Sequence, residues 1–155
     1  MPRATKTTAT KVIAGLQAAA PELLFWDWWK VGLEVRGRLD RALAPLGLRP
    51  RGFWLLAIAG LGNVSQHEIA GLCGLDPSTL VALIDGLERR GWLRREPNPR
   101  DRRVHWVQRT EAGDRLFTRA VALAQRAEAR QLAVLSAAQQ RQLLAAMRKL
   151  ATISK

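Results

Sequence analysis

The sequence is poor in cysteine and in long apolar runs, and each shortage excludes a class of protein. Cys73 is the one cysteine of the 155-residue chain, which excludes an internal disulfide framework and leaves too few soft ligands for a structural zinc site. The longest apolar runs fall far short of the ~20 residues that span a bilayer, and the chain shows no secretory leader pattern. We therefore expect a soluble cytoplasmic protein, without a membrane partner, whose fold is held by packing alone.

Motifs for catalysis are also lacking. The chain has no glycine-rich phosphate loop, no nucleophile elbow, and no His-Glu-x-x-His or paired-cysteine motif. His67 and His105 have no cluster of further ligands near them in the sequence. We therefore expect no enzyme activity, no cofactor and no bound metal.

The chain has far fewer acidic than basic residues. Twenty-five Lys and Arg oppose 13 Asp and Glu, which gives a formal charge of +12 at pH 7 and favours a polyanionic partner. Composition alone leaves nucleic acid and acidic membrane surfaces as alternatives. Residues 1–20, with three basic residues among Thr and Ala, are expected to form a flexible basic tail, and residues 21–155 a single domain.

Helices are predicted at both ends of this domain. Apolar residues recur at spacings of three and four up to Leu46, which predicts a long helix over residues 21–46. Its start is apolar nearly all round, so a second subunit or a ligand is expected to cover it. Thr110 caps a further helix, and Ser136 with Gln139 forms a capping box that starts the last one.

The centre of the chain predicts two short helices that meet at a glycine turn. Ser65 and Glu68 form a capping box that starts the first helix, and Gly74 ends it. Asp76 offers an N-cap for the second helix, which occupies residues 77–90 with a proline at its first position. Because apolar residues of both helices face inward, the pattern predicts a helix-turn-helix.

The second of these helices would expose a set of small side chains. Hydroxyls of this set can bond phosphates or base edges, and its apolar members can pack on thymine methyl groups. The alternative is an ordinary solvated helix face. The predicted DNA-contacting residues of this helix are Pro77, Ser78, Thr79, Val81 and Ala82, with Asp85 on the same side or its flank.

A β-hairpin is predicted after this helix, because residues 92–96 and 103–108 have strand-like composition and flank two prolines. Six arginines lie between positions 94 and 109. Arginines at a hairpin tip can enter a narrow minor groove or neutralise phosphates, and we predict these roles for Arg100, Arg102 and Arg103. The alternative is a solvated loop. Asp101 is expected to orient one of these arginines by a charge-assisted hydrogen bond.

The segment "VSQHEIAGLCGLDPSTLVALIDGLERRGWLRREPNPRDRRVHWVQRTEAG" resembles the DNA-binding core of the MarR family of transcriptional regulators, and the likeness extends over about residues 22–153. The resemblance implies a mainly α fold with one β-hairpin wing: a winged helix-turn-helix over residues 47–110, flanked by dimerisation helices over residues 21–46 and 111–153. It also implies a homodimeric repressor that binds a pseudo-palindromic operator in double-stranded DNA and is released by a small, often aromatic ligand. The expected dimer contacts are Leu24, Phe25, Leu143, Leu144, Met147 and Leu150.

The chain departs from the family pattern at two places. Val81 and Ala82 stand where the family often has Thr and Arg, so more of the affinity for DNA is expected to come from the wing. Arg109 replaces the usual Leu, which is expected to alter one core or hairpin contact without changing the architecture.

Three features keep two interpretations each. Trp26, Trp29, Phe53 and Trp54 either line a pocket for an aromatic effector or pack in the core or the dimer. Cys73 is either a small buried hydrophobe or a redox switch. The protein as a whole is either a sequence-specific regulator or an architectural protein that binds DNA without sequence preference.

Overall fold

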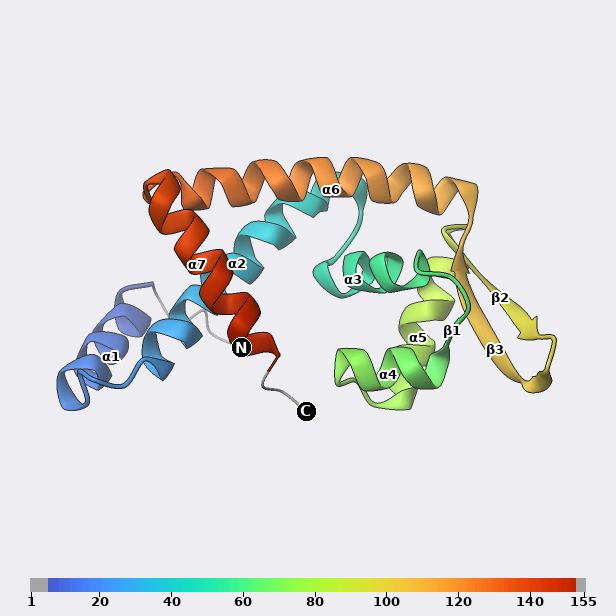
Figure 1. Cartoon of the computed structure of the whole chain (residues 1–155), viewed down its shortest axis with the longest axis horizontal. Helices are drawn as coiled ribbons and strands as arrows, with labels where there is room; N and C mark the ends of the chain where they lie inside the picture. The colour runs from blue at the N-terminus through green and yellow to red at the C-terminus, as the bar shows by residue number, and fades with distance from the viewer. Residues whose placement is uncertain (1–5, 153–155) are drawn as a thin grey trace. The chain divides into compact units, whose positions relative to one another are not determined.

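The computed structural model describes residues 6–152, which divide between Arg38 and Leu39 into two compact units. The first unit holds helix α1 (Lys6–Ala19) and most of helix α2 (Phe25–Leu43). Figure 1 shows the order of the elements along the chain. The second unit contains the predicted helix-turn-helix and wing, and therefore most of the predicted site.

The second unit is built from helices around one small sheet. After the end of α2 come a single 3-10 turn (Ala44–Leu46), α3 (Pro50–Ala59), β1 (Val64–Ser65), α4 (Gln66–Cys73) and α5 (Pro77–Glu88). The hairpin strands β2 (Leu93–Asn98) and β3 (Asp101–Arg109) follow, and then α6 (Glu111–Leu132) and α7 (Ala137–Ala151). In Figure 1, α3, α4 and α5 lie together on one side of the hairpin, and α6 continues from the end of β3. The fold class predicted from the sequence, mainly α with one β-hairpin wing, is confirmed.

The core of the second unit joins every element from the end of α2 to α6. Its fully buried side chains are aliphatic, and they come from the helices of the helix-turn-helix as well as from both hairpin strands. Burying a side chain of this size contributes about 1.5–3 kcal/mol each to folding. The buried hydrophobic residues are Leu43, Leu48, Phe53, Leu55, Leu56, Ala59, Ile69, Leu80, Ile84, Leu87, Leu93, Val107, Leu116 and Ala120.

The sheet has three antiparallel strands in the order β1-β3-β2, one more than predicted. β2 pairs along β3 from Leu93 opposite Arg109 to the tip, and β1 adds Val64 opposite Val107. The hairpin strands also reach further toward the tip than expected, since β2 ends only at Asn98. The wing is therefore anchored along both sides of β3 close to its base.

The prediction of a basic tail without regular structure is wrong for Lys6–Ala19, which is helical. Alanine and leucine are strong helix formers, and the segment contains four alanines and Leu16 without a proline. Charge alone was therefore a poor guide to structure there. Residues 1–5 of the predicted tail lie outside the described residues.

The long N-terminal helix of the domain is shorter than predicted at both ends. Residues 20–23 form a turn, in which the Leu23 N–H donates to the Ala20 carbonyl, so α2 begins at Phe25 rather than at Pro21. The α-helix ends at Leu43, because Pro45 has no N–H to donate and the chain tightens into the 3-10 turn. α5 likewise ends at Glu88, two residues before the predicted end.

Among residues 6–152, no single helix is long and apolar enough to cross a membrane. The pair α4 and α5 reaches that length and composition only when the two are taken together, and they are bent by 112°.

Candidate nucleic-acid interface

Caps at both ends of α4 lead the chain into α5, as the sequence predicts. The Ser65 Oγ accepts from the Glu68 N–H, and the Glu68 carboxylate accepts from the Ser65 N–H, so the predicted capping box starts α4. These contacts with Ser65 also lower the pKa of Glu68. Gly74 then ends α4 with a φ of 58°, a left-handed conformation that glycine adopts without strain.

Asp76 fixes the start of α5. Its Oδ1 accepts from the Ser78 hydroxyl at 2.6 Å and from the Thr79 N–H at 2.8 Å. These hydrogen bonds favour the carboxylate and hold the pKa of Asp76 far below its ordinary value. Pro77 occupies the first turn, where no N–H is needed.

The inward face of α5 is buried and its opposite face is not. Leu80, Ile84 and Leu87 are buried in the core. Of the five residues predicted to contact DNA from α5, four are exposed and Thr79 is half-buried; the exposed ones are Pro77, Ser78, Val81 and Ala82. The exposed face is thus short, small in side-chain volume and uncharged.

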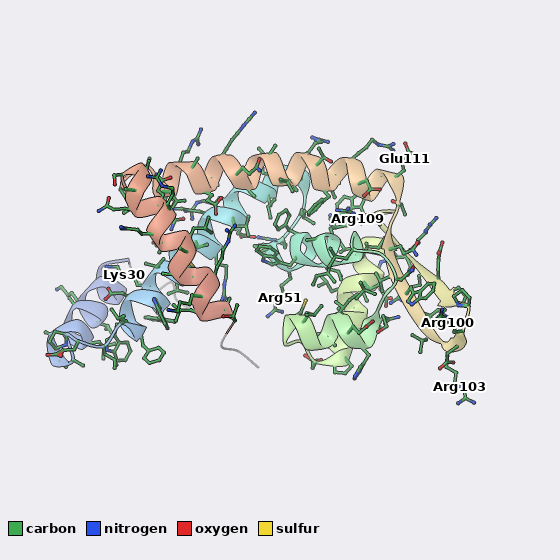
Figure 2. The ribbon with its side chains drawn as sticks, viewed as in Figure 1. Lys30, Arg51, Arg100, Arg103, Arg109 and Glu111 are labelled. Carbon is green, nitrogen blue, oxygen red and sulfur yellow. The ribbon has the colours of Figure 1, made fainter. Side chains whose placement is uncertain are left out.

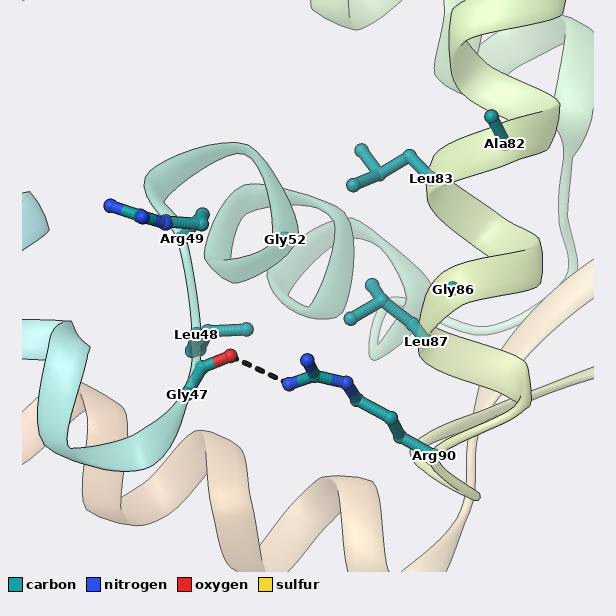
Figure 3. A pocket seen from close by; sticks show the side chains of 9 residues that line it. All are labelled: Gly47, Leu48, Arg49, Gly52, Ala82, Leu83, Gly86, Leu87 and Arg90. Atoms are coloured by element: carbon teal, nitrogen blue, oxygen red, sulfur yellow. Dashed lines mark hydrogen bonds between the residues drawn. The ribbon is translucent and has the colours of Figure 1, made fainter.

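The far end of α5 is tied to the turn before α3. Arg90 Nη1 donates to the Gly47 carbonyl at 2.7 Å, and this contact lies beside a small pocket of about 180 Å³ (Figure 3). Gly47 takes a left-handed φ of 63° at this turn. The α5 side of the pocket is lined by Ala82, Leu83, Gly86 and Leu87. Arg90 therefore holds α5 against α3 behind its exposed face.

The wing tip presents arginines to solvent. Arg100 and Arg103 lie at the tip, and Figure 2 shows Arg103 extending away from the protein. Both are exposed, and within the described residues neither guanidinium has a hydrogen bond or ion pair to the protein. The side chain of Arg102, the third predicted contact, lies outside the described residues. The tip can therefore offer at least two unneutralised guanidinium groups to an anion.

The sequence predicts that Asp101 orients an arginine side chain by a charge-assisted hydrogen bond, but among the described side chains Asp101 contacts none of the arginines. Its Oδ1 accepts from the backbone N–H of Arg103 at 3.0 Å, and Asn98 makes the equivalent contact with the N–H of Arg100. Asp and Asn commonly accept in this way from the backbone two residues on. Asp101 therefore shapes the turn and leaves the described tip guanidinium groups unpaired.

The base of the wing is held firmly to α6. Thr110 caps α6, its N–H donates to the Trp92 carbonyl, and its hydroxyl donates to the Gly91 carbonyl at 2.6 Å. Arg109 is largely buried, with its Nε 2.8 Å from Asp114 Oδ1 and its guanidinium carbon 4.4 Å from the centre of the Phe117 ring. The prediction that Arg109 changes a local contact and not the architecture agrees with this arrangement.

A contact between the wing and α5 was not predicted from the sequence. The side chain of Arg95 on β2 forms ion pairs with Asp85 and Glu88 of α5. Asp85, which was expected on the DNA-facing side, is therefore engaged with the wing. Two carboxylates at i and i+3 on one helix were a visible signal, although only the fold reveals which arginine they meet.

The four predicted effector residues have different surroundings. Phe53 is buried and stacks on Phe117 with ring centres 5.5 Å apart, so it is a core residue. Trp54 is 55% exposed. It lines a cleft of about 440 Å³ between α3 and α4, together with Arg51, Ile58, Leu72, Cys73, Gly74 and Leu75. Trp26 and Trp29 belong to the first unit.

Cys73 is half-buried at the edge of this cleft, and its burial raises the pKa of the thiol. A raised pKa leaves less of the reactive thiolate at neutral pH. This favours the interpretation of Cys73 as a small hydrophobe over the redox switch.

The predicted dimer residues are all exposed in the single chain. On α7 four apolar side chains recur at i, i+1, i+4 and i+7, with exposed fractions of 41% to 61%: Leu143, Leu144, Met147 and Leu150. Leu24 and Phe25 in the first unit are 64% and 65% exposed. In the described part of the chain, no group of three or more His, Cys, Asp or Glu side chains is placed to hold a metal ion.

Comparison with known proteins gives consistent results. The sequence pattern of the MarR family matches residues 49–105, which contain α3 to most of β3. The repressor Rv2887 of Mycobacterium tuberculosis H37Rv is 31% identical over 137 residues, which cover 88% of this chain and 97% of Rv2887. The regulator PecS of Dickeya dadantii is 32% identical over 105 residues, and the match spans 63% of PecS and 65% of this chain.

A solved structure is similar over nearly the whole chain. The repressor CouR bound to a 23-mer DNA duplex has a TM-score of 0.78 and is 33% identical, covering 90% of this chain and 97% of CouR. CouR of Rhodococcus jostii RHA1 has also been solved with p-coumaroyl-CoA, and Rv2887 with salicylic acid.

Proposed function

The chain belongs to the MarR family of transcriptional regulators, and we propose that it is a homodimeric repressor that binds a palindromic operator and releases it when a small aromatic ligand binds. The observation that carries the proposal is the exposed face of α5 beside a wing whose two described tip arginines, Arg100 and Arg103, have exposed guanidinium groups without a protein partner among the described residues. A helix of this kind fits the major groove, and tip arginines fit the adjacent minor groove or its phosphates.

The side chains of α5 and of the wing tip suit different kinds of DNA contact. The exposed part of α5 offers the Ser78 hydroxyl and the apolar Val81 and Ala82, which suit thymine methyl groups better than guanine edges. Arg100 and Arg103 supply positive charge, which binds any sequence and is sensitive to salt. We therefore propose that the wing provides most of the affinity and that α5 provides selectivity for A·T-rich steps.

The apolar stripe of α7 supports the proposed dimer. Its four leucine and methionine side chains are about half exposed in the single chain, and removing apolar surface from water contributes about 25 cal/mol per Å². A second copy of the chain would cover this stripe and would place two α5 helices on one DNA duplex. A stable monomer at micromolar concentration in analytical ultracentrifugation would contradict this part of the proposal.

For the ligand we propose the cleft beside Trp54. Its walls are apolar side chains and an indole, and Arg51 stands at its rim between α3 and α4 (Figure 2). An aromatic acid would place its ring between these walls and its carboxylate on the guanidinium. Titration with salicylate should quench tryptophan fluorescence in the parent protein, and both Trp54→Phe and Arg51→Gln should weaken the response. Equal responses in all three proteins would place the ligand elsewhere.

The test of the main proposal is selection of genomic DNA fragments by the purified protein at ~150 mM salt, followed by footprinting of the recovered fragments. A regulator should recover a few fragments that share a palindromic site. Uniform recovery would instead support the architectural protein, because its affinity would come from phosphates and DNA deformability alone.

A further inference from the structure

Arg95 on β2 faces α5 rather than solvent. The side chain of Arg95 is 21% exposed, and its Nη2 lies 2.6 Å from Asp85 Oδ1. Its Nη1 donates to the Glu88 carboxylate, and the backbone N–H of Arg95 donates to the other oxygen of that carboxylate at 3.1 Å. Three hydrogen bonds therefore connect one residue of β2 to two acidic residues on one face of α5.

The alternation of side chains along β2 explains why Arg95 and its neighbour differ. Leu93 is buried in the core, and Arg95, two residues on, lies on the same side of the strand and meets α5. Arg94 lies on the other side, where it contacts Glu96 at 3.0 Å and the cross-strand Gln108 at 3.1 Å. Arg94 is thus paired within the wing, whereas Arg95 is paired between the wing and the helix.

We propose that Arg95 is a positioning residue that fixes the angle between the wing and α5, and so determines which DNA positions the two elements contact together. This inference rests on the proposed function of the protein as a DNA-binding regulator. Two carboxylates form ion pairs with the guanidinium of Arg95, so its positive charge is already neutralised within the protein. A planar guanidinium can bridge two acceptors in a fixed geometry, which a lysine cannot.

The contacts of Arg95 with Asp85 and Glu88, which we call the clamp, lie at mid-length of the hairpin. Losing them would therefore displace the wing tip by a large distance. Asn98, at the end of β2, lies three positions beyond Arg95, which is about 10 Å of strand. A rotation of ~15° about the clamp would then move the tip by roughly 3 Å, more than the width of the hydrogen-bonding range. Arg100 and Arg103 would no longer meet the phosphates or the minor groove that α5 selects.

The experiment compares four variants on a site recovered by the fragment selection, with binding and hydroxyl-radical footprints measured at one salt concentration. Arg95→Gln, Asp85→Asn and Glu88→Gln each remove one side of the clamp. Arg94→Gln is the matched control, since it removes the same charge one residue away. We expect each clamp variant to lose about tenfold in affinity, equivalent to about 1.4 kcal/mol, and to lose protection under the wing while protection under α5 remains.

The direction of the change in DNA affinity is decisive for the two acidic variants, Asp85→Asn and Glu88→Gln. Removing a negative charge near DNA should strengthen binding by simple electrostatics, so weaker binding by Asp85→Asn and Glu88→Gln can come only through Arg95 or through the stability of the fold. A loss of folded protein would fade the whole footprint evenly and lower the melting temperature in step with affinity. Selective loss of the wing footprint separates positioning from stability.

A double-mutant cycle completes the test. If Arg95 acts through Asp85, then Arg95→Gln combined with Asp85→Asn should cost little more than either change alone. Tighter binding by the acidic variants, or a footprint of Arg95→Gln identical to that of Arg94→Gln, would overturn the proposal. If the parent protein selects no site at all, the proposed function fails; if it selects a site and the clamp variants behave like the control, only the role of Arg95 fails.

Discussion

The substitution Gly113→Ala tests how tightly the wing is joined to α6. Gly113 is buried as the third residue of α6, where its N–H donates to the capping Thr110 Oγ1 at 3.0 Å. A Cβ at this position would lie 2.0 Å from the Trp92 carbonyl oxygen and 3.0 Å from its carbon. That carbonyl already accepts from the Thr110 N–H, so it cannot move away without breaking the junction.

Two opposing contributions, overpacking and helix propensity, determine how much stability Gly113→Ala loses. Contacts to a Cβ are essentially never shorter than 3.0 Å, so backbone on both sides must separate by at least 1 Å. Overpacking of this kind costs about 1–3 kcal/mol, and the upper part of that range applies because no flexible side chain can yield. The higher helix propensity of alanine returns up to about 1 kcal/mol. The net loss of stability is therefore about 2 kcal/mol, or a melting temperature lower by about 4–8 °C.

The assay is urea denaturation and thermal melting at one protein concentration, with Gly71→Ala as the control. Gly71 lies inside α4, and a Cβ there would meet nothing within 4 Å, so the control should gain up to about 1 kcal/mol from helix propensity alone. The two variants make the same chemical change and should move stability in opposite directions. If Gly113→Ala were as stable as the parent protein, the close junction of Trp92 with α6 would be refuted.

Three further predictions address DNA binding, pH and redox chemistry. Arg103→Ala should weaken binding to a selected site more than Lys11→Ala, because a desolvated groove contact is worth more than a screened one; equal losses in a gel-shift titration would count against the wing tip. The pKa of Asp76 is lower in the folded protein than its ordinary 3.8, so the cap is fully stabilising above that pH and is lost as the pH falls toward the folded value. Asp76→Asn, which keeps an N-cap, should therefore show a shallower loss of stability than the parent below about pH 4 in acid titrations followed by circular dichroism. Peroxide should release DNA equally from the parent and from Cys73→Ser, and a release seen only in the parent would restore the redox switch.

The sequence predicted those parts of the fold that depend on neighbours three or four residues apart. The capping boxes at Ser65 and Ser136 and the N-cap at Asp76 all form, because each depends on a side chain and a backbone group within one helical turn. The buried face of α5 was equally accessible, since a helical period places Leu80, Ile84 and Leu87 together.

Contacts between distant segments were not predictable from such patterns. β1 is two residues long, and it becomes a strand only because β3, about forty residues further on, pairs with Val64 and Ser65. The partners of Arg95 were missed for a related reason. Six arginines in one short segment look alike in composition, and only the strand register separates Arg95, which faces α5, from Arg94 and from the tip.

The attachments of the wing differ along its length, and this difference bears on how the protein would read DNA. At the base, Thr110 and Arg109 join the hairpin to α6, and at mid-length Arg95 joins it to α5. At the tip, the described guanidinium groups have no protein partner, and Asp101 and Asn98 accept hydrogen bonds from the backbone N–H groups of Arg103 and Arg100. On DNA binding, mainly the tip side chains would therefore lose conformational entropy, because the strands that carry them are already fixed. Because the exposed face of α5 is short and uncharged, discrimination between DNA sites would depend on this fixed spacing between helix and tip more than on the hydrogen bonds of either element alone.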